Sequence, residues 1–169
     1  TSSVFRTHMQ ACADALAPHT DWSLLDVIQE HPDAPTLDRI DVVQPVLFAT
    51  MTSLAALWQS HGIQPHAVIG HSQGEIAAAH TAGILTLDDA ARIVTLRSQA
   101  LRQLSGQGGM VSLPLPADQA TTLIAPWNNR ISIAAHNGPT TTIVSGDTQA
   151  LTELTTTCTT QHIDARTIP

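Results

Sequence analysis

The spacing of apolar residues divides the chain into helical stretches and short extended ones. Three early stretches carry apolar residues at helical spacing, and we expect helices over residues 4–16, 22–28 and 43–58. The third stretch is apolar on nearly every side, which is typical of a helix buried in a core, and Pro45 suits its first turn. The prolines within residues 31–35 mark the loop that precedes it.

A short apolar run then gives way to glycines and small residues. His66–Ile69 is expected to be a strand, Gly70-His71-Ser72-Gln73-Gly74-Glu75 a tight turn, and the residues to about Gly83 a helix. A G-x-S-x-G turn between strand and helix predicts a nucleophile elbow, which strains the backbone and exposes the serine hydroxyl. Side chains at Gly70 and Gly74 would collide with the adjoining elements. A chance match is the alternative, and the flanking elements weigh against it.

The last third of the chain predicts a separate small unit. A helix over residues 87–104 opens with an acidic variant of the capping box and leads into the glycine-rich loop 105–109. Beyond it we expect a β-α-β-β-α-β order over residues 110–115, 117–125, 131–135, 141–145, 148–157 and 163–168. We therefore predict the α/β class, with a hydrolase-like core in residues 1–107 and a ferredoxin-like α+β subdomain in residues 108–169.

Composition narrows the class of protein. The 169 residues are 43% hydrophobic and 12% charged with a net charge of −7, so we expect a compact cytoplasmic domain that binds no nucleic acid. We expect no membrane association, because no stretch approaches the length of a membrane span. Cys12 and Cys158 are expected to be free, partly buried thiols. The nine histidines form no metal-ligand motif, so no metal site is expected.

Ser72 needs an oxyanion hole and a base to act as a nucleophile. In an elbow the backbone N–H of the next residue, Gln73, points to where the oxyanion forms, and the helix N-terminus assists it. Neighbouring side chains on a tight turn point apart, so we interpret His71 as a supporting hydrogen-bonding group. His80 lies about two helical turns further on and points away from the serine.

Arg97 occupies an unusual position in the helix predicted over residues 87–104. Ala90, Val94, Leu101 and Leu104 recur at three- and four-residue steps, and Arg97 falls on the same apolar stripe. A buried charge without a partner is costly. Two interpretations remain open: a structural ion pair or a side chain that extends to water, and a bidentate clamp for a substrate carboxylate.

Motifs spread along the whole chain resemble the acyltransferase domain of modular type I polyketide synthases, relatives of malonyl-CoA:acyl carrier protein transacylase. They are Gln44-Pro45 with Leu47-Phe48-Ala49, the elbow over residues 70–75, Arg97-Ser98, Gly108-Gly109-Met110, Asn137-Gly138-Pro139 and Ser145-Gly146. The resemblance implies that Ser72 takes an acyl group from a coenzyme A thioester and passes it to the phosphopantetheine thiol of an acyl carrier protein.

The resemblance also assigns binding residues and partners. Arg97 is expected to hold the free carboxylate of the extender unit, with Gln44 and His71 also in the substrate site. The implied partners are the acyl carrier protein and the neighbouring ketosynthase and other synthase domains. The implied domain binds no cofactor of its own.

Two segments resemble signatures of methylmalonyl-selective domains. One is Arg39-Ile40-Asp41-Val42-Val43-Gln44, and the other is Gln73, where malonyl-selective domains tend to carry an aliphatic residue. A malonyl-selective transferase is the alternative function. The alternative interpretation of residues 39–44 is the start of a buried helix that does not affect selectivity. One methyl group in a pocket changes binding by only about 1–3 kcal/mol.

Part of the family pattern is missing from the sequence. The family's glutamine-containing oxyanion loop is expected upstream of Thr1, and its histidine base shortly after Pro169. We therefore expect a fragment truncated at both ends that does not turn over alone. An α/β-hydrolase thioesterase or esterase is a second candidate, since it shares the elbow. A third is a domain that only docks carrier proteins or stabilises a larger synthase.

Overall fold

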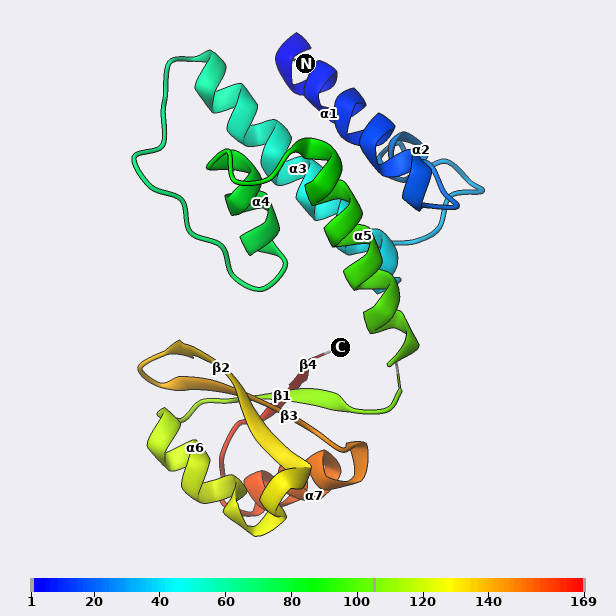
Figure 1. The fold of residues 1–169 in the computed structure, drawn as a ribbon. Helices are drawn as coiled ribbons and strands as arrows, with labels where there is room; N and C mark the ends of the chain where they lie inside the picture. The colour runs from blue at the N-terminus through cyan, green and yellow to red at the C-terminus, as the bar shows by residue number, and fades with distance from the viewer. Residues whose placement is uncertain (1, 105, 169) are drawn as a thin grey trace. The chain divides into compact units, whose positions relative to one another are not determined.

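The computed structural model describes residues 2–104 and 106–168, and they form two compact units (Figure 1). The first unit ends at Gln103 and the second begins at Leu104. This boundary lies a few residues before the expected one at residues 107 and 108. Each unit has its own core, and the two are described separately below.

The regular secondary structure of the first unit consists of helices in the part that the structure describes. Its elements are α1 (Ser3–Leu16), the 3-10 helix η1 (Ala17–His19), α2 (Leu24–Ile28), α3 (Ile40–Ser60), α4 (Gly74–Thr81) and α5 (Leu87–Gln103). The long α3 packs against α1 on one side and α5 on another, and α4 lies beside it (Figure 1). The helices predicted from apolar spacing are thus confirmed, with ends shifted by a few residues.

Helix α3 departs from its prediction in two respects. It begins at Ile40, so Pro45 lies in the second turn and not the first. It is also buried on only part of its surface: Phe48 is fully buried, whereas Leu47 and Trp58 are exposed by 44% and 58%. Among the described residues α3 alone is long and apolar enough to cross a membrane, but soluble core helices share those properties, and α3 packs against α1 and α5.

The strand expected over His66–Ile69 is not formed. Residues 2–103 contain no β-strand, and the segment before the elbow is an irregular loop in which Ile69 is 98% exposed. A strand exists only when its N–H and C=O groups pair with a neighbouring strand. No partner strand lies within the described residues of this unit, so the apolar run forms a loop.

The second unit follows the predicted β-α-β-β-α-β order. Its elements are β1 (Gly109–Leu113), α6 (Ala117–Ile124), the 3-10 helix η2 (Ala125–Arg130), β2 (Ile131–Gly138), β3 (Thr141–Gly146), α7 (Thr148–Thr160) and β4 (Arg166–Ile168). The strands form one antiparallel sheet in the order β2-β3-β1-β4, with Val111 of β1 opposite Val144 of β3 and Thr167 of β4. Helices α6 and α7 lie on the same face of it (Figure 1).

The core of the second unit lies between this sheet and its two helices. Val111, Leu113, Val144, Leu154 and Cys158 are all fully or almost fully buried there. The last strand begins at residue 166 and not 163, because residue 163 still closes the end of α7 through a backbone hydrogen bond. The pattern of apolar and polar residues therefore predicted the strands and helices of this unit correctly.

Candidate functional site

The elbow is present as a strained turn at the start of α4. Ser72 has a φ of 55°, in the left-handed region that residues other than glycine rarely adopt. The Gly74 N–H donates to the His71 carbonyl at 3.0 Å, and the Glu75 N–H donates to the Ser72 carbonyl at 3.1 Å. Strain of this kind persists where the surrounding structure imposes it, and it is common at functional turns. The turn and the helix after it are confirmed.

Close packing of the turn depends on only one of its two glycines. A Cβ at Gly70 would overlap the backbone of Glu75 and Gly74, so only glycine fits. A Cβ at Gly74 would meet no described atom within 4 Å, so the prediction that Gly74 is needed to avoid a collision is wrong. Gly74 is the first residue of α4, where the helix turns away from the preceding loop.

Ser72 and His71 are exposed, and Gln73 is half-buried. Gln73 precedes α4, so its backbone N–H belongs to the first, unsatisfied turn of a helix, where partial positive charge gathers. Its side-chain Oε1 is buried and has no hydrogen-bond partner among the described residues. The turn therefore combines an exposed hydroxyl with a nearby region of positive potential.

No described histidine forms a hydrogen bond with the Ser72 hydroxyl. His71 is exposed beside it, and the His80 Nδ1 lies 3.1 Å from the Leu85 carbonyl, with its ring near Phe48. The His80 ring therefore contacts Phe48 of α3 and the residues that follow α4. Within residues 2–104 and 106–168 there is also no group of three His, Cys, Asp or Glu side chains that could hold a metal ion.

Arg97 and Gln44 are brought together by the packing of α5 on α3. The Arg97 Nη1 donates to the Gln44 Oε1 at 2.8 Å. No ion pair joins Arg97 to a described carboxylate, so its charge is not neutralised by this part of the chain. The two residues lie 53 positions apart in sequence, and both were assigned to substrate binding from the sequence.

The burial predicted for Arg97 is wrong, because the side chain is exposed. Ala90 and Val94 are buried as expected, but further along α5 the buried residues are Thr95 and Ser98. The buried stripe thus rotates past Arg97 and leaves it at the edge of the helix contact. Of the interpretations left open, a structural ion pair is not formed with any described residue, and the exposure fits a side chain that extends to water. The clamp for a substrate carboxylate stays a prediction.

Sequence reasoning missed a buried carboxylate next to this pair. The Asp41 side chain is 6% exposed and accepts hydrogen bonds from the Arg39 Nε and Nη2 at 3.2 and 2.7 Å. It also accepts from the Arg102 Nη1 at 3.0 Å. Hydrogen bonding to Arg39, followed by the charges of Arg39 and Arg102, holds the pKa of Asp41 below its usual value, against the opposing effect of burial.

The two cysteines are free and buried, so the prediction of free thiols is confirmed and both are more buried than expected. Burial raises the pKa of both thiols. A buried thiol of raised pKa is a poor nucleophile, which leaves Ser72 as the exposed candidate on the elbow.

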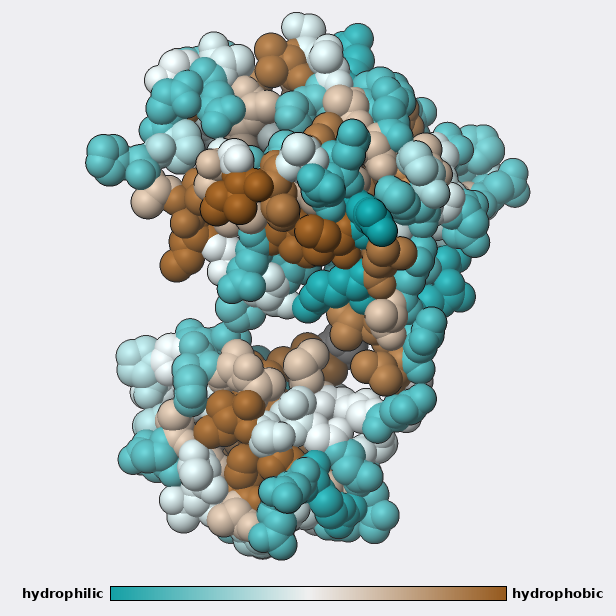
Figure 2. All heavy atoms as spheres, viewed as in Figure 1, coloured by the Kyte–Doolittle hydropathy of each residue, from teal (hydrophilic) through white to brown (hydrophobic). Residues whose placement is uncertain are grey.

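An open apolar groove of about 530 Å³ adjoins the start of α4. It is lined mainly by apolar side chains of α3, α4 and the loop between them, among them Met51, Trp58, Ile63, Val68, Ile69 and Ala78. Figure 2 shows hydrophobic residues gathered over the part of the first unit where Figure 1 places α4. The turn that carries Ser72 therefore borders apolar surface.

Comparison with known proteins gives one consistent match over the whole chain. Residues 1–168 match the family described as "Acyl transferase domain". The mycoketide-CoA synthase of Mycobacterium tuberculosis is 56% identical over 168 residues, which is 99% of this chain and 4% of that protein. The erythronolide synthase EryA3 of Saccharopolyspora erythraea is 52% identical over 166 residues, 98% of this chain and 5% of that protein.

Solved structures give the same result at the level of the fold. The acyltransferase domain from module 8 of the salinomycin polyketide synthase superposes with a TM-score of 0.94 at 52% identity, covering 99% of this chain and 40% of that one. FabD from Acinetobacter baumannii superposes with a TM-score of 0.86 at 25% identity, covering 99% of this chain and 54% of that one. The chain thus spans a small part of these curated relatives and 40–54% of these solved chains.

Proposed function

The chain belongs to the acyltransferase domains of modular polyketide synthases, and we propose that it moves an extender unit from coenzyme A to an acyl carrier protein. Ser72 carries the acyl group as an ester between the two steps. The observation that supports this assignment best is the strained, exposed Ser72 in the same unit as an arginine that no described carboxylate neutralises. A serine hydrolase has no evident use for that arginine.

In the first step the Ser72 Oγ attacks the thioester carbonyl. The Oγ–C bond forms, the C–S bond breaks, and coenzyme A leaves as the thiol after taking a proton. The Gln73 N–H stabilises the oxyanion, assisted by the N-terminus of α4. No described histidine forms a hydrogen bond with the Ser72 hydroxyl, and the family resemblance implies that a histidine takes the serine proton. The phosphopantetheine thiol of the carrier then attacks the ester and releases Ser72.

Arg97 binds the free carboxylate of a dicarboxylic acyl group. Its guanidinium has five N–H donors in a rigid plane, and the hydrogen bond to Gln44 engages one of them. The remaining donors suit the two oxygens of a carboxylate, and the fixed orientation holds the acyl group for transfer to the carrier thiol. His71, beside Ser72 on the exposed turn, contributes a further polar group to this site.

Methylmalonyl is the extender unit that we propose, from the signature over residues 39–44 and from Gln73. A malonyl-selective transferase of the same family is the alternative. The function of a thioesterase or esterase is less well supported, because it leaves Arg97 without a role.

We also propose that the first unit is part of a hydrolase-like core and that the second unit is ferredoxin-like. The protein works in the cytoplasm beside a ketosynthase domain.

The test is acylation of Ser72 in the complete polypeptide that carries this chain. Incubation with methylmalonyl-CoA, with intact-mass detection, should show one stable adduct in the wild type and none in Ser72→Ala. Arg97→Ala should lose methylmalonyl loading while propionyl-CoA still loads. Release of free acid without a detectable adduct would favour the hydrolase, and equal loss of both substrates would give Arg97 a structural role only.

A further inference from the structure

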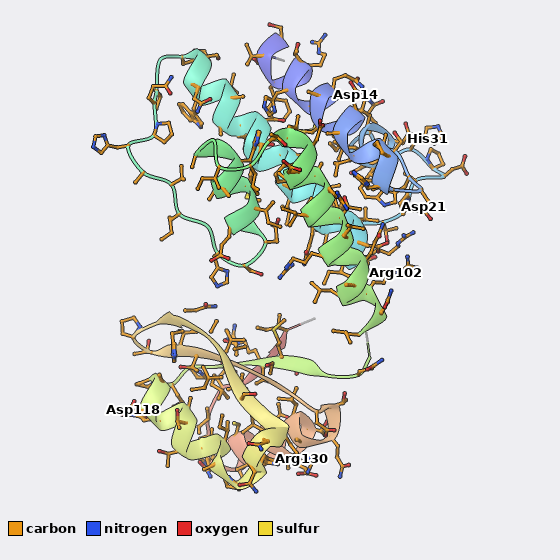
Figure 3. All side chains as sticks on the ribbon, in the orientation of Figure 1. Asp14, Asp21, His31, Arg102, Asp118 and Arg130 are labelled. Atoms are coloured by element: carbon orange, nitrogen blue, oxygen red, sulfur yellow. The ribbon has the colours of Figure 1, made fainter. Side chains whose placement is uncertain are left out.

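Helices α3 and α5 are joined by two polar links near the start of α3. Gln44 pairs with Arg97 at 2.8 Å, and Asp41 pairs with Arg102 at 3.0 Å. Residue numbers rise along α3 while they fall along α5, so the helices run antiparallel here. Arg102 extends from the last turn of α5, one to two turns beyond Arg97 (Figure 3). The two hydrogen bonds therefore lie next to each other between the same two helices.

Pro45 makes the first turn of α3 dependent on such links. A proline has no N–H, so the hydrogen bond that would run from residue 45 back to the Asp41 carbonyl is missing. The turn that carries Asp41 and Gln44 is therefore tied less firmly to the rest of the helix. Its start is held by the Val42 and Val43 N–H groups, both of which donate to the Arg39 carbonyl.

Asp41 is suited to hold this turn. Its carboxylate is 6% exposed and takes three N–H donors, two from Arg39 and one from Arg102. Arg39 lies next to it on the same segment, so that pair closes a local loop. Arg102 connects the carboxylate to the other helix. A buried carboxylate that loses one such partner is destabilised where it stands, and the segment that carries it shifts.

We infer that Asp41 and Arg102 form a positioning pair for the substrate arginine. They hold the first turn of α3 against α5, which places the Gln44 Oε1 where it orients the Arg97 guanidinium. The inference rests on the proposed function, because it concerns how the carboxylate of the acyl group is received. It also separates the residues of the 39–44 segment: Asp41 anchors it, and Gln44 makes the contact.

The experiment compares Arg102→Met with Arg102→Lys in the complete polypeptide. Arg102 is exposed by 56% on its side chain, so its loss should leave the protein folded. Arg102→Met should lower kcat/KM for methylmalonyl-CoA roughly 10- to 100-fold, mainly through KM, and leave propionyl-CoA loading unchanged. Arg102→Lys, which keeps the charge, should restore most of it. Arg92→Met, an exposed arginine on α5 outside the described ion pairs, is the matched control.

Amide hydrogen exchange gives a second readout that needs no turnover. In Arg102→Met the amides of residues 41–44 should exchange faster, while those of the buried middle of α5 stay protected. Equal loss of both acyl-CoA substrates, faster exchange throughout the first unit, or no change in either readout would overturn the inference. If the wild type loads no carboxylated acyl group, the proposed function fails, and the exchange experiment still decides whether Arg102 anchors the turn.

Discussion

The two units of the chain differ in how fully their backbone segments are paired and their apolar side chains are buried. In the second unit β1 has partners on both sides, and the sheet and its helices enclose an apolar core. In the first unit the segment that leads into the elbow has no partner strand among the described residues, and Ile69 is 98% exposed. The residues proposed for chemistry lie in the unit whose local pairing is less complete, and Ser72 has a positive φ. Functional turns commonly have this character.

Buried polar groups show the same contrast. Asp41, Thr52, Ser53, Thr95 and Ser98 are buried in the first unit, whereas Thr142 is the buried polar residue of the second among those described. Buried polar groups are costly unless they are hydrogen-bonded, and once paired they fix a specific arrangement of helices. Buried polar side chains thus lie mainly in the first unit, where polar contacts link α1 to α3 and α3 to α5.

The largest predicted effect tests whether the two cores are independent. Phe48 and Leu154 are both fully buried, one in each unit. Phe48→Ala should lower the free energy of unfolding of the first unit by about 3–5 kcal/mol, and Leu154→Ala that of the second by about 2–5 kcal/mol, from lost burial and a cavity. Urea unfolding with amide exchange read separately in residues 2–103 and 106–168 measures both.

Each loss of protection should be confined to the unit that carries the substitution. If Leu154→Ala weakened protection in α3 and α5 as much as in its own sheet, the two units would unfold as one. The two units would then be regions of a single cooperative structure.

A smaller effect is expected at the elbow, where the chain offers a matched pair of glycines. Gly70→Ala forces a Cβ into the backbone of Glu75 and should cost about 1–3 kcal/mol of local stability at the start of α4. Acylation of Ser72 should fall roughly 100-fold, because a small displacement of the nucleophile is costly. Gly74→Ala meets no described atom and should leave the free energy of unfolding unchanged or slightly raised. Equal destabilisation by both substitutions would contradict the packing described here.

The sequence predicts the structure of the second unit more completely than that of the first. The order of the second unit is predictable because the apolar alternation marks its strands, and because β2 and β3 are joined by a short turn. The elbow is predictable from its G-x-S-x-G motif and the helix after it, although only Gly70 is needed for close packing. The strand before the elbow is not, because pairing depends on residues outside the run itself.

The polar contacts of the first unit show what local pattern cannot supply. Asp41 in a first turn and Arg102 in a last turn both suit the helix dipole, so nothing in their positions signals a pairing across 61 residues. The exposure of Arg97 was misjudged for a related reason. A stripe drawn through Ala90 and Val94 continues through Thr95 and Ser98, whose burial reflects the packing of α5 against its neighbours and not hydrophobicity.

The smallest predicted effect concerns pH and again distinguishes the two units. In the first unit the His8 Nδ1 lies 3.4 Å from the Ser53 Oγ and 3.7 Å from the Cys12 Sγ, and its ring lies 6.3 Å from that of His80. Burial, with a smaller contribution from the charge of His80, lowers the pKa of His8. The unfolded chain therefore binds a proton near the ordinary histidine pKa of about 6.5, while the folded unit binds it only at lower pH. Between these two values the unfolded state holds more protons, so the stability of the first unit should fall as the pH drops below about 6.5.

Urea midpoints at several pH values should show this fall in the wild type and a weaker one in His8→Gln. His136→Gln, an exposed position in the second unit, should leave the profile of the first unit as it is, and a profile that His8→Gln does not change would assign the pH dependence to other groups.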